Sequence, residues 1–108
     1  MQISVTGRHV KVTEEVKDYA ARKAEKLPRF YDRVQAIEVV LDHEAGDFTV
    51  DMIVTSGKSN FIAHESGPDV FALVDLITDK LERQLTRHKE KFRNRKHLSR
   101  RVDKFEGT

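Results

Sequence analysis

Cationic side chains recur once per helical turn in the second half of the chain. They are Lys80, Arg83, Arg87 and Lys91. At about 100° per residue these four fall on one side of a helix, whereas acidic side chains fall on a second side: Asp75, Asp79, Glu82 and Glu90. A pair of opposite charges within a helix contributes only about 0.2–0.5 kcal/mol, so helix stability does not explain a cationic side. Binding to phosphate groups would explain such a side, because Lys and Arg contact phosphates without reading a base sequence.

The charge of the chain is also distributed unevenly along its length. Residues 1–79 contain nine Lys or Arg against fourteen Asp or Glu, a net charge of −5, whereas residues 80–104 contain eleven against three, a net charge of +8. The complete chain has a net charge of only +2. Such asymmetry indicates a polyanionic partner, with nucleic acid favoured over an anionic membrane. A solvated helix with a cationic tail is the plain alternative.

The five histidines do not form a metal-binding motif. They are His9, His43, His64, His88 and His97. None belongs to an H-x-H or H-E-x-x-H pattern. We expect histidines at loop ends, such as His43 and His64, to be solvated, and His88 to be partly buried with a structural role. The sequence therefore predicts no metal site.

Catalytic patterns are missing as well. The chain has no Cys, which excludes disulfides, thiol catalysis and cysteine metal sites. The segment SGKS at residues 56–59 lacks the gap and the second glycine of a phosphate-binding loop, and no nucleophile elbow is present. The sequence predicts no catalytic residues, no cofactor and no enzyme. A small RNA-cleaving enzyme that uses His88 or His64 is the least favoured hypothesis.

Hydrophobic periodicity and turn residues predict the elements that position the cations. They indicate a strand at 2–6, a helix from Thr13 to Leu27 that Pro28 ends, strands at 35–43, 48–55 and 60–65, and a helix from about residue 66 into the low nineties. Turns are expected at 44–47 and 56–59. Ser66 or Gly67 is expected to cap the last helix, with Pro68 in its first turn.

The order β-α-β-β-β-α predicts an α+β fold, a four-stranded mixed sheet with two helices packed on one face. The two strands joined through the first helix are expected to be parallel neighbours. An apolar stripe of the long helix would cover the sheet: Val70, Val74, Ile77, Leu81, Leu85, His88 and Phe92. Residues 1–92 are expected to form one domain with one modest core, and residues 93–108 a basic C-terminal tail that is partly disordered.

The first helix adds four cations to the predicted surface: Arg22, Lys23, Lys26 and Arg29. Lys23 lies near the centre of the apolar stripe of its helix, so its ammonium group must extend outward. Two helices side by side would bring these cations next to those of the long helix, in a broad basic groove with Tyr19, Phe30 and Tyr31 near its margin. Because the short loops leave no free recognition helix, RNA binding by shape is favoured over sequence-specific DNA binding.

The N-terminal segment MQISVTGRHV contains no long apolar region. No later segment is apolar enough to span a bilayer. We therefore expect a cytoplasmic protein without a membrane partner, which is a monomer when free.

Two long segments of the chain resemble a known family. VTGRHVKVTEEVKDYAARKAEKLPRFYDRV (residues 5–34) and DVFALVDLITDKLERQLTRHKEKF (residues 69–92) closely resemble the short ribosome hibernation-promoting factors and ribosome-associated inhibitors, also called ribosomal subunit interface proteins. The likeness extends from residue 3 to about residue 92. Its most specific parts are TG..V..T from Thr6 to Thr13 and DKL.RQL.RHK.K from Asp79 to Lys91.

This resemblance implies a domain similar to double-stranded-RNA-binding folds. It implies binding to the small (30S) ribosomal subunit in the channel where messenger and transfer RNAs meet, contact with ribosomal RNA through two basic helices, and inhibition of translation when growth slows. The phosphate contacts that it implies by position are Arg22, Lys23, Lys26, Lys80, Arg83, Arg87, Lys89 and Lys91; Arg29 completes the predicted RNA-binding set. The alternative is a general structured-RNA-binding module of the double-stranded-RNA-binding type.

The chain departs from parts of the family pattern. Long family members carry a second domain that dimerises ribosomes, for which this chain has no room. The segment RNRKHLSRRVDKFEGT at residues 93–108 does not match the extension by which some inhibitors oppose ribosome dimers. The resemblance therefore leaves open whether the protein promotes or stabilises ribosome dimers or opposes them.

Overall fold

The computed structural model describes the backbone of residues 1–57 and 59–106 and the side chains of residues 1–57 and 59–90. Its elements follow in the order β1 (Gln2–Gly7), α1 (Glu14–Ala24), the 3₁₀-helix η1 (Leu27–Arg29), β2 (Ala36–Glu44), β3 (Asp47–Ser56), β4 (Ser59–Gly67) and α2 (Val70–Glu106). The predicted β-α-β-β-β-α order is therefore confirmed. No helix within the described residues is both long enough and apolar enough to cross a membrane.

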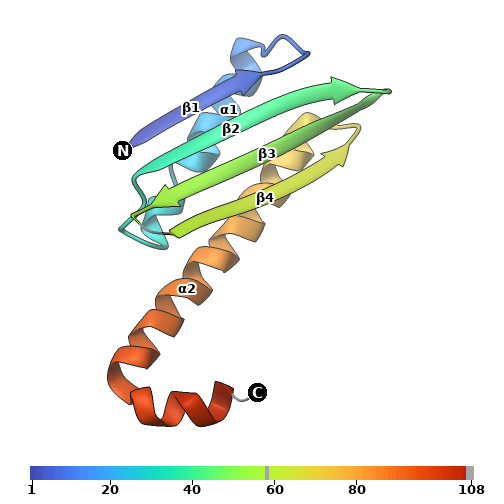
Figure 1. Cartoon of the computed structure of the whole chain (residues 1–108). Coiled ribbons are helices and arrows are strands. Elements are labelled where there is room, and N and C mark those ends of the chain that lie inside the picture. The colour runs from blue at the N-terminus through green and yellow to red at the C-terminus, as the bar shows by residue number, and fades with distance from the viewer. Residues whose placement is uncertain (58, 107–108) are drawn as a thin grey trace.

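The four strands form one sheet in the order β1-β2-β3-β4. β1 pairs with β2 in parallel, with Val5 opposite Val39, and the other two neighbouring pairs are antiparallel. Both helices lie on the same face of the sheet, and the other face is open (Figure 1). The predicted α+β fold, with its mixed sheet and one helical layer, is confirmed.

The two hairpin turns lie where the turn residues predicted them. In the first, Glu44 pairs with Asp47 and the two residues between them have positive φ, 53° at Ala45 and 86° at Gly46. Two consecutive residues with positive φ match the right-handed twist of a hairpin. The second turn contains Gly57 at φ 55°, and residue 58 lies outside the described part of the chain.

The core lies between the covered face of the sheet and the two helices. β2 and β3 contribute their alternate side chains, and α2 contributes a stripe at helical spacing; the main members are Ile37, Val39, Leu41, Val50, Met52, Val54, Val74, Ile77, Leu81 and Leu85. α1 contributes Ala20 and Ala24, whose small side chains let the helix approach the sheet closely. The predicted stripe is confirmed from Val70 to Leu85, and the side chain of Phe92 lies outside the described residues.

The ends of α1 are set by Thr13 and Pro28. The Thr13 hydroxyl accepts a hydrogen bond from the Val16 N–H at 3.2 Å, which confirms the predicted N-cap. The helix ends at Ala24, so the prediction that it reaches Leu27 is wrong. A proline disfavours α-helical geometry at the residue before it, and Leu27 and Pro28 instead form the short η1 turn.

α2 begins later and ends later than predicted. The carboxylate of Asp69 accepts hydrogen bonds from the N–H groups of Phe71 at 3.0 Å and Ala72 at 3.4 Å, so Asp69 caps the helix. Ser66 and Gly67 end β4 instead of capping α2, and Pro68 precedes the helix. The helix continues past the low nineties to Glu106, because no Gly or Pro lies between Pro68 and Gly107 to interrupt it.

Candidate RNA-binding surface

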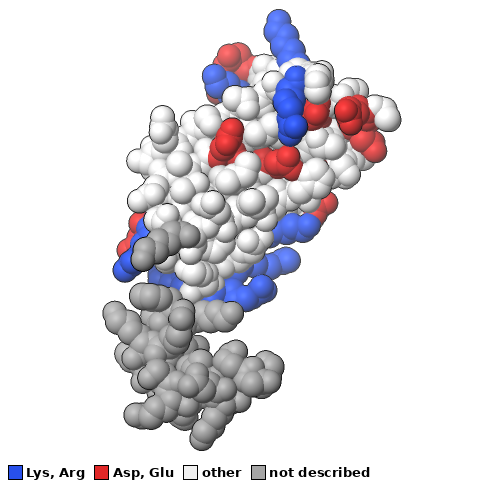
Figure 2. All heavy atoms as spheres, viewed as in Figure 1, with Lys and Arg blue, Asp and Glu red and all other residues white. Residues whose placement is uncertain are grey.

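The predicted RNA-binding cations lie on the helical side of the molecule. Among those with described side chains, six are exposed and form what we call the cationic surface: Arg22, Lys26, Arg29, Arg83, Arg87 and Lys89. Lys23 and Lys80 are half-buried, and the side chain of Lys91 lies outside the described residues. Figure 2 looks onto the opposite, open face of the sheet and shows mostly uncharged atoms across its centre.

Lys23 connects the two helices. Its Nζ lies 3.2 Å from the carboxylate of Asp75 in α2, and the Tyr19 hydroxyl donates to the same carboxylate at 2.5 Å. The hydrogen bond from Tyr19, together with Lys23, holds the pKa of Asp75 below its ordinary value although partial burial opposes this. The bond to Asp75 also raises the pKa values of Tyr19 and Lys23. The Lys23 charge is therefore paired with a carboxylate of α2, in a contact where the side chains of Lys23 and Asp75 are 28% and 49% exposed.

Lys80 lies on the other flank of α2. It forms an ion pair with Glu65 of β4, and on the same flank the Gln84 side chain donates to the backbone carbonyl of Ile62 at 3.3 Å. α1 packs against the opposite flank, which carries Asp75. Lys23 and Lys80 therefore each face a carboxylate of a neighbouring element, although both side chains stay partly exposed. Their part in the predicted basic groove stays a prediction.

Arg83 and Arg87 face a shallow hollow of about 320 Å³ between α2 and the end of η1. Phe30 lines this hollow, as do Glu82 and Glu90. The predicted separation of acidic from basic side chains on α2 is therefore incomplete. The reason is geometric: at about 100° per residue, positions seven apart such as Arg83 and Glu90 lie almost above one another.

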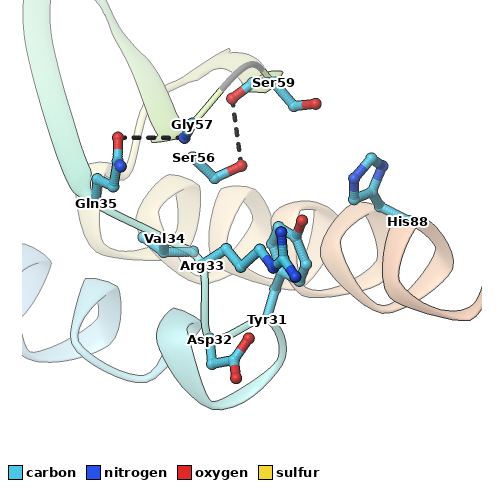
Figure 3. A pocket seen from close by; sticks show the side chains of 9 residues that line it. All are labelled: Tyr31, Asp32, Arg33, Val34, Gln35, Ser56, Gly57, Ser59 and His88. Atoms are coloured by element: carbon cyan, nitrogen blue, oxygen red, sulfur yellow. Dashed lines mark hydrogen bonds between the residues drawn. The ribbon is translucent and has the colours of Figure 1, made fainter. Parts of the chain in front are cut away.

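A larger hollow of about 770 Å³ lies between the η1–β2 connection, the β3–β4 turn and α2. Figure 3 shows Tyr31 and Arg33 below the turn, with His88 on α2 beside them. The ring of His88 lies 5.2 Å from that of Tyr31 and 5.1 Å from that of Phe61, both edge to face, which confirms its predicted partly buried, structural role. Aromatic and guanidinium groups can also stack on unpaired bases. No local pattern in the sequence indicates this hollow, because its walls come from three distant segments.

The other histidines with described side chains are exposed, as expected for His43 and His64. These two lie within β2 and β4, however, and not at loop ends. Each exposed histidine contacts a neighbour. The ring of His43 lies 4.5 Å from that of Phe48. His64 forms a hydrogen bond with Asp51, and His9 lies within hydrogen-bond distance of Asp42. The side chain of His97 lies outside the described residues.

The fold and the site define an α+β domain whose single helical layer carries the cationic surface. The chain belongs to the family described as "Sigma 54 modulation protein / S30EA ribosomal protein", whose model matches residues 3–93. The ribosome hibernation promoting factor of Escherichia coli K12 is 36% identical over 93 residues, which cover 86% of this chain and 98% of that protein. The factor of the same name from Azotobacter vinelandii is 31% identical over 103 residues, 95% of this chain and 96% of that protein.

Solved structures agree with this assignment. A ribosomal subunit interface protein from Coxiella burnetii superposes with a TM-score of 0.77 at 26% identity, covering 83% of this chain and 99% of that one. The N-terminal domain of Protein Y from Thermus thermophilus gives a TM-score of 0.73 at 27% identity, covering 82% and 99%. The predicted family is therefore confirmed: it is a family of ribosome-associated hibernation factors and not of enzymes.

Proposed function

We propose that the protein binds the small ribosomal subunit in the channel where messenger and transfer RNAs meet, and that it inhibits translation from there. The observation that carries this proposal is the exposure of six cations on the helical segments of a chain from this family. Cations that contact phosphates give affinity and orientation without base readout. Such contacts suit the folded ribosomal RNA of the decoding region. The protein acts in the cytoplasm, where ribosomes are, and is a monomer when free.

The proposed mechanism is steric. Arg83 and Arg87 contact ribosomal phosphates directly, whereas Lys23 and Lys80 mainly hold the helices in position through their carboxylate partners. The bound domain then occupies space that messenger and transfer RNAs need. No chemical step is required, and occupancy alone controls translation.

The test is a pair of charge-reversal variants with equal changes in net charge. Arg83→Glu combined with Arg87→Glu should abolish co-sedimentation with small subunits in a sucrose gradient. Lys11→Glu combined with Lys17→Glu reverses the charges of two exposed residues outside the predicted set. This variant should still co-sediment with small subunits. Lys80 stays unchanged, because a glutamate there would face Glu65 and disturb the fold.

Equal weakening by both variants would show that only the total charge matters, and retained binding by the arginine variant would refute the proposed surface. Excess transfer RNA and messenger RNA should displace the wild-type protein, whereas a free RNA duplex should compete poorly. A duplex that competes as well as the subunit would indicate a general RNA-binding module instead. The same gradients resolve ribosome dimers, so they also measure whether the protein promotes or opposes them.

A further inference from the structure

Three side chains that commonly bind metals meet at the end of β2. His9 comes from the loop after β1, and Asp42 and Glu44 are alternate residues of β2, so the two carboxylates share a side of the strand. The ligating atoms of the three residues all lie within 4.8 Å of one another. His9 and Asp42 are 33 positions apart in the sequence, which explains why short spacing motifs predicted no metal site.

The backbone holds two of these residues in place. The Arg8 N–H donates to the Leu41 carbonyl at 2.8 Å, which fixes the loop beside β2. Gly7 permits this tight path, because a Cβ at that position would overlap the backbone oxygen of Val10. The N–H groups of His43 and His9 then donate to Asp42 Oδ1 at 2.8 and 3.3 Å. Both the carboxylate and the loop opposite it are therefore positioned before any ligand binds.

Asp42 is the buried member of this group. Asp42 is only 9% exposed, and burial alone would raise the pKa of its carboxyl group. The hydrogen bonds from the His43 N–H and from His9, helped by the charge of Arg8, outweigh burial and hold the pKa below the ordinary value. The contacts with His9 also fix the orientation of the carboxylate toward the imidazole ring.

We propose that His9, Asp42 and Glu44 bind one divalent transition-metal ion of the zinc type. His9 would bind through Nδ1 and each carboxylate through one oxygen. In a tetrahedral site with bonds of about 2.0–2.1 Å, neighbouring ligand atoms lie about 3.3 Å apart. His9 Nδ1 already lies 3.2 and 3.3 Å from the two oxygens of Asp42. The metal would take the place of the hydrogen bond between His9 and Asp42. The exposed Glu44 would complete the site by a side-chain rotation, with water as the fourth ligand.

The ligand set also selects the class of ion. Imidazole nitrogen suits zinc, nickel, copper and iron, whereas magnesium and calcium prefer oxygen ligands alone. Because the imidazole must be neutral to bind, acid should weaken the site. This site lies apart from the cationic surface, so it does not depend on the proposed ribosomal function.

The chain provides a matched control. His64 and Asp51 form the same kind of imidazole–carboxylate pair on the open face of the sheet. Asp51 also forms an ion pair with Arg8, with 3.6 Å between the guanidinium nitrogen and the carboxylate oxygen. Among the described residues, however, only the His9 group brings three such ligands together. A comparison of variants at the two pairs therefore distinguishes metal binding from the effect of losing a simple His–Asp hydrogen bond.

The experiment is calorimetric titration of Zn²⁺ into the full chain, with Co²⁺ titration followed by its visible absorption. We expect one ion per chain, with no competition from Mg²⁺. His9→Gln and Glu44→Gln should each weaken binding at least about tenfold, since even the loss of a group that only supports a ligand costs about 10- to 100-fold. His64→Gln should bind as the wild type does. Lowering the pH from neutral to about 5 should weaken wild-type binding.

Thermal unfolding controls for damage to the fold. With a chelator present, wild type and both ligand variants should melt at similar temperatures, and Zn²⁺ should raise the melting temperature of the wild type but not of the two ligand variants. The proposal is overturned if the wild type binds no Zn²⁺, if both ligand variants bind it as tightly as the wild type, or if His64→Gln removes the binding. Asp42 is not substituted, because it anchors the loop as well as the ion.

Discussion

The flanks and the outer face of α2 carry the same residue types but differ in how their charges are used. On the flanks, Asp75 binds Lys23 of α1 and Lys80 binds Glu65 of β4. On the outer face, Arg83 and Arg87 are exposed. Ion pairs near the surface typically stabilise a fold by at most about 1 kcal/mol, so the flanking pairs mainly fix where the helix lies. The difference teaches that exposure, and not residue type, selects the cations available to a partner.

The largest expected effect comes from the side of α2 that faces the sheet. Leu81 is fully buried, so Leu81→Ala should lower the free energy of unfolding by about 2–5 kcal/mol. Arg83→Ala on the outer face should change it by no more than about 0.5 kcal/mol. Urea unfolding followed by circular dichroism measures both. Similar losses for the two variants would mean that Arg83 is part of the fold and not of the cationic surface.

A smaller effect, on the salt dependence of binding to small subunits, distinguishes the outer face of α2 from its flanks. Each lost phosphate contact should reduce the slope of log affinity against log salt by about 0.7–0.9. Arg83→Ala should show this reduction in binding to small subunits. Lys80→Ala should show a smaller one, because the charge of Lys80 is already paired with Glu65. Equal slopes for the two variants would contradict the division between paired and available cations.

The smallest effect concerns the pair between the helices. Asp75→Asn should lower the free energy of unfolding by about 0.2–1 kcal/mol at neutral pH. Because the folded pKa of Asp75 is depressed, its contribution is present above the unfolded value near 3.8 and is lost as the pH falls below it. Between about pH 5 and pH 3 the wild type should therefore lose more stability than Asp75→Asn.

The urea midpoint at several pH values measures this difference. Asp18→Asn, at an exposed carboxylate of α1, is the control and should follow the wild type. If Asp75→Asn loses stability in acid as steeply as the wild type, the carboxylate does not join the helices in the way the contacts indicate.

The sequence predicted the elements well because their signals are local. Val74 and Ile77 recur at helical spacing and are buried, and Gly46 marked its turn correctly. The partner of a charge is not a local property. A helical projection of α2 shows that Asp75 and Lys80 lie on different flanks, but it does not show which flank α1 covers.

The limits of the site prediction have the same physical origin. The hollow beside His88 and the contact of His9 with Asp42 both form only when distant segments meet. The cations themselves were recognised from residue type and spacing, since exposure on a helix follows from the position of its apolar stripe. Their contacts with RNA stay a prediction.

The position of α2 after all four strands has a consequence for synthesis of the chain. β2, β3 and β4 are joined by short turns and pair with their sequence neighbours, so this meander can form as soon as it is made. Its apolar face stays uncovered until Val74, Ile77, Leu81 and Leu85 have been made. Arg83 and Arg87 belong to the same turns of that helix. A nascent chain therefore completes its core in the same step in which it gains Arg83 and Arg87, two exposed cations of the proposed RNA-binding surface.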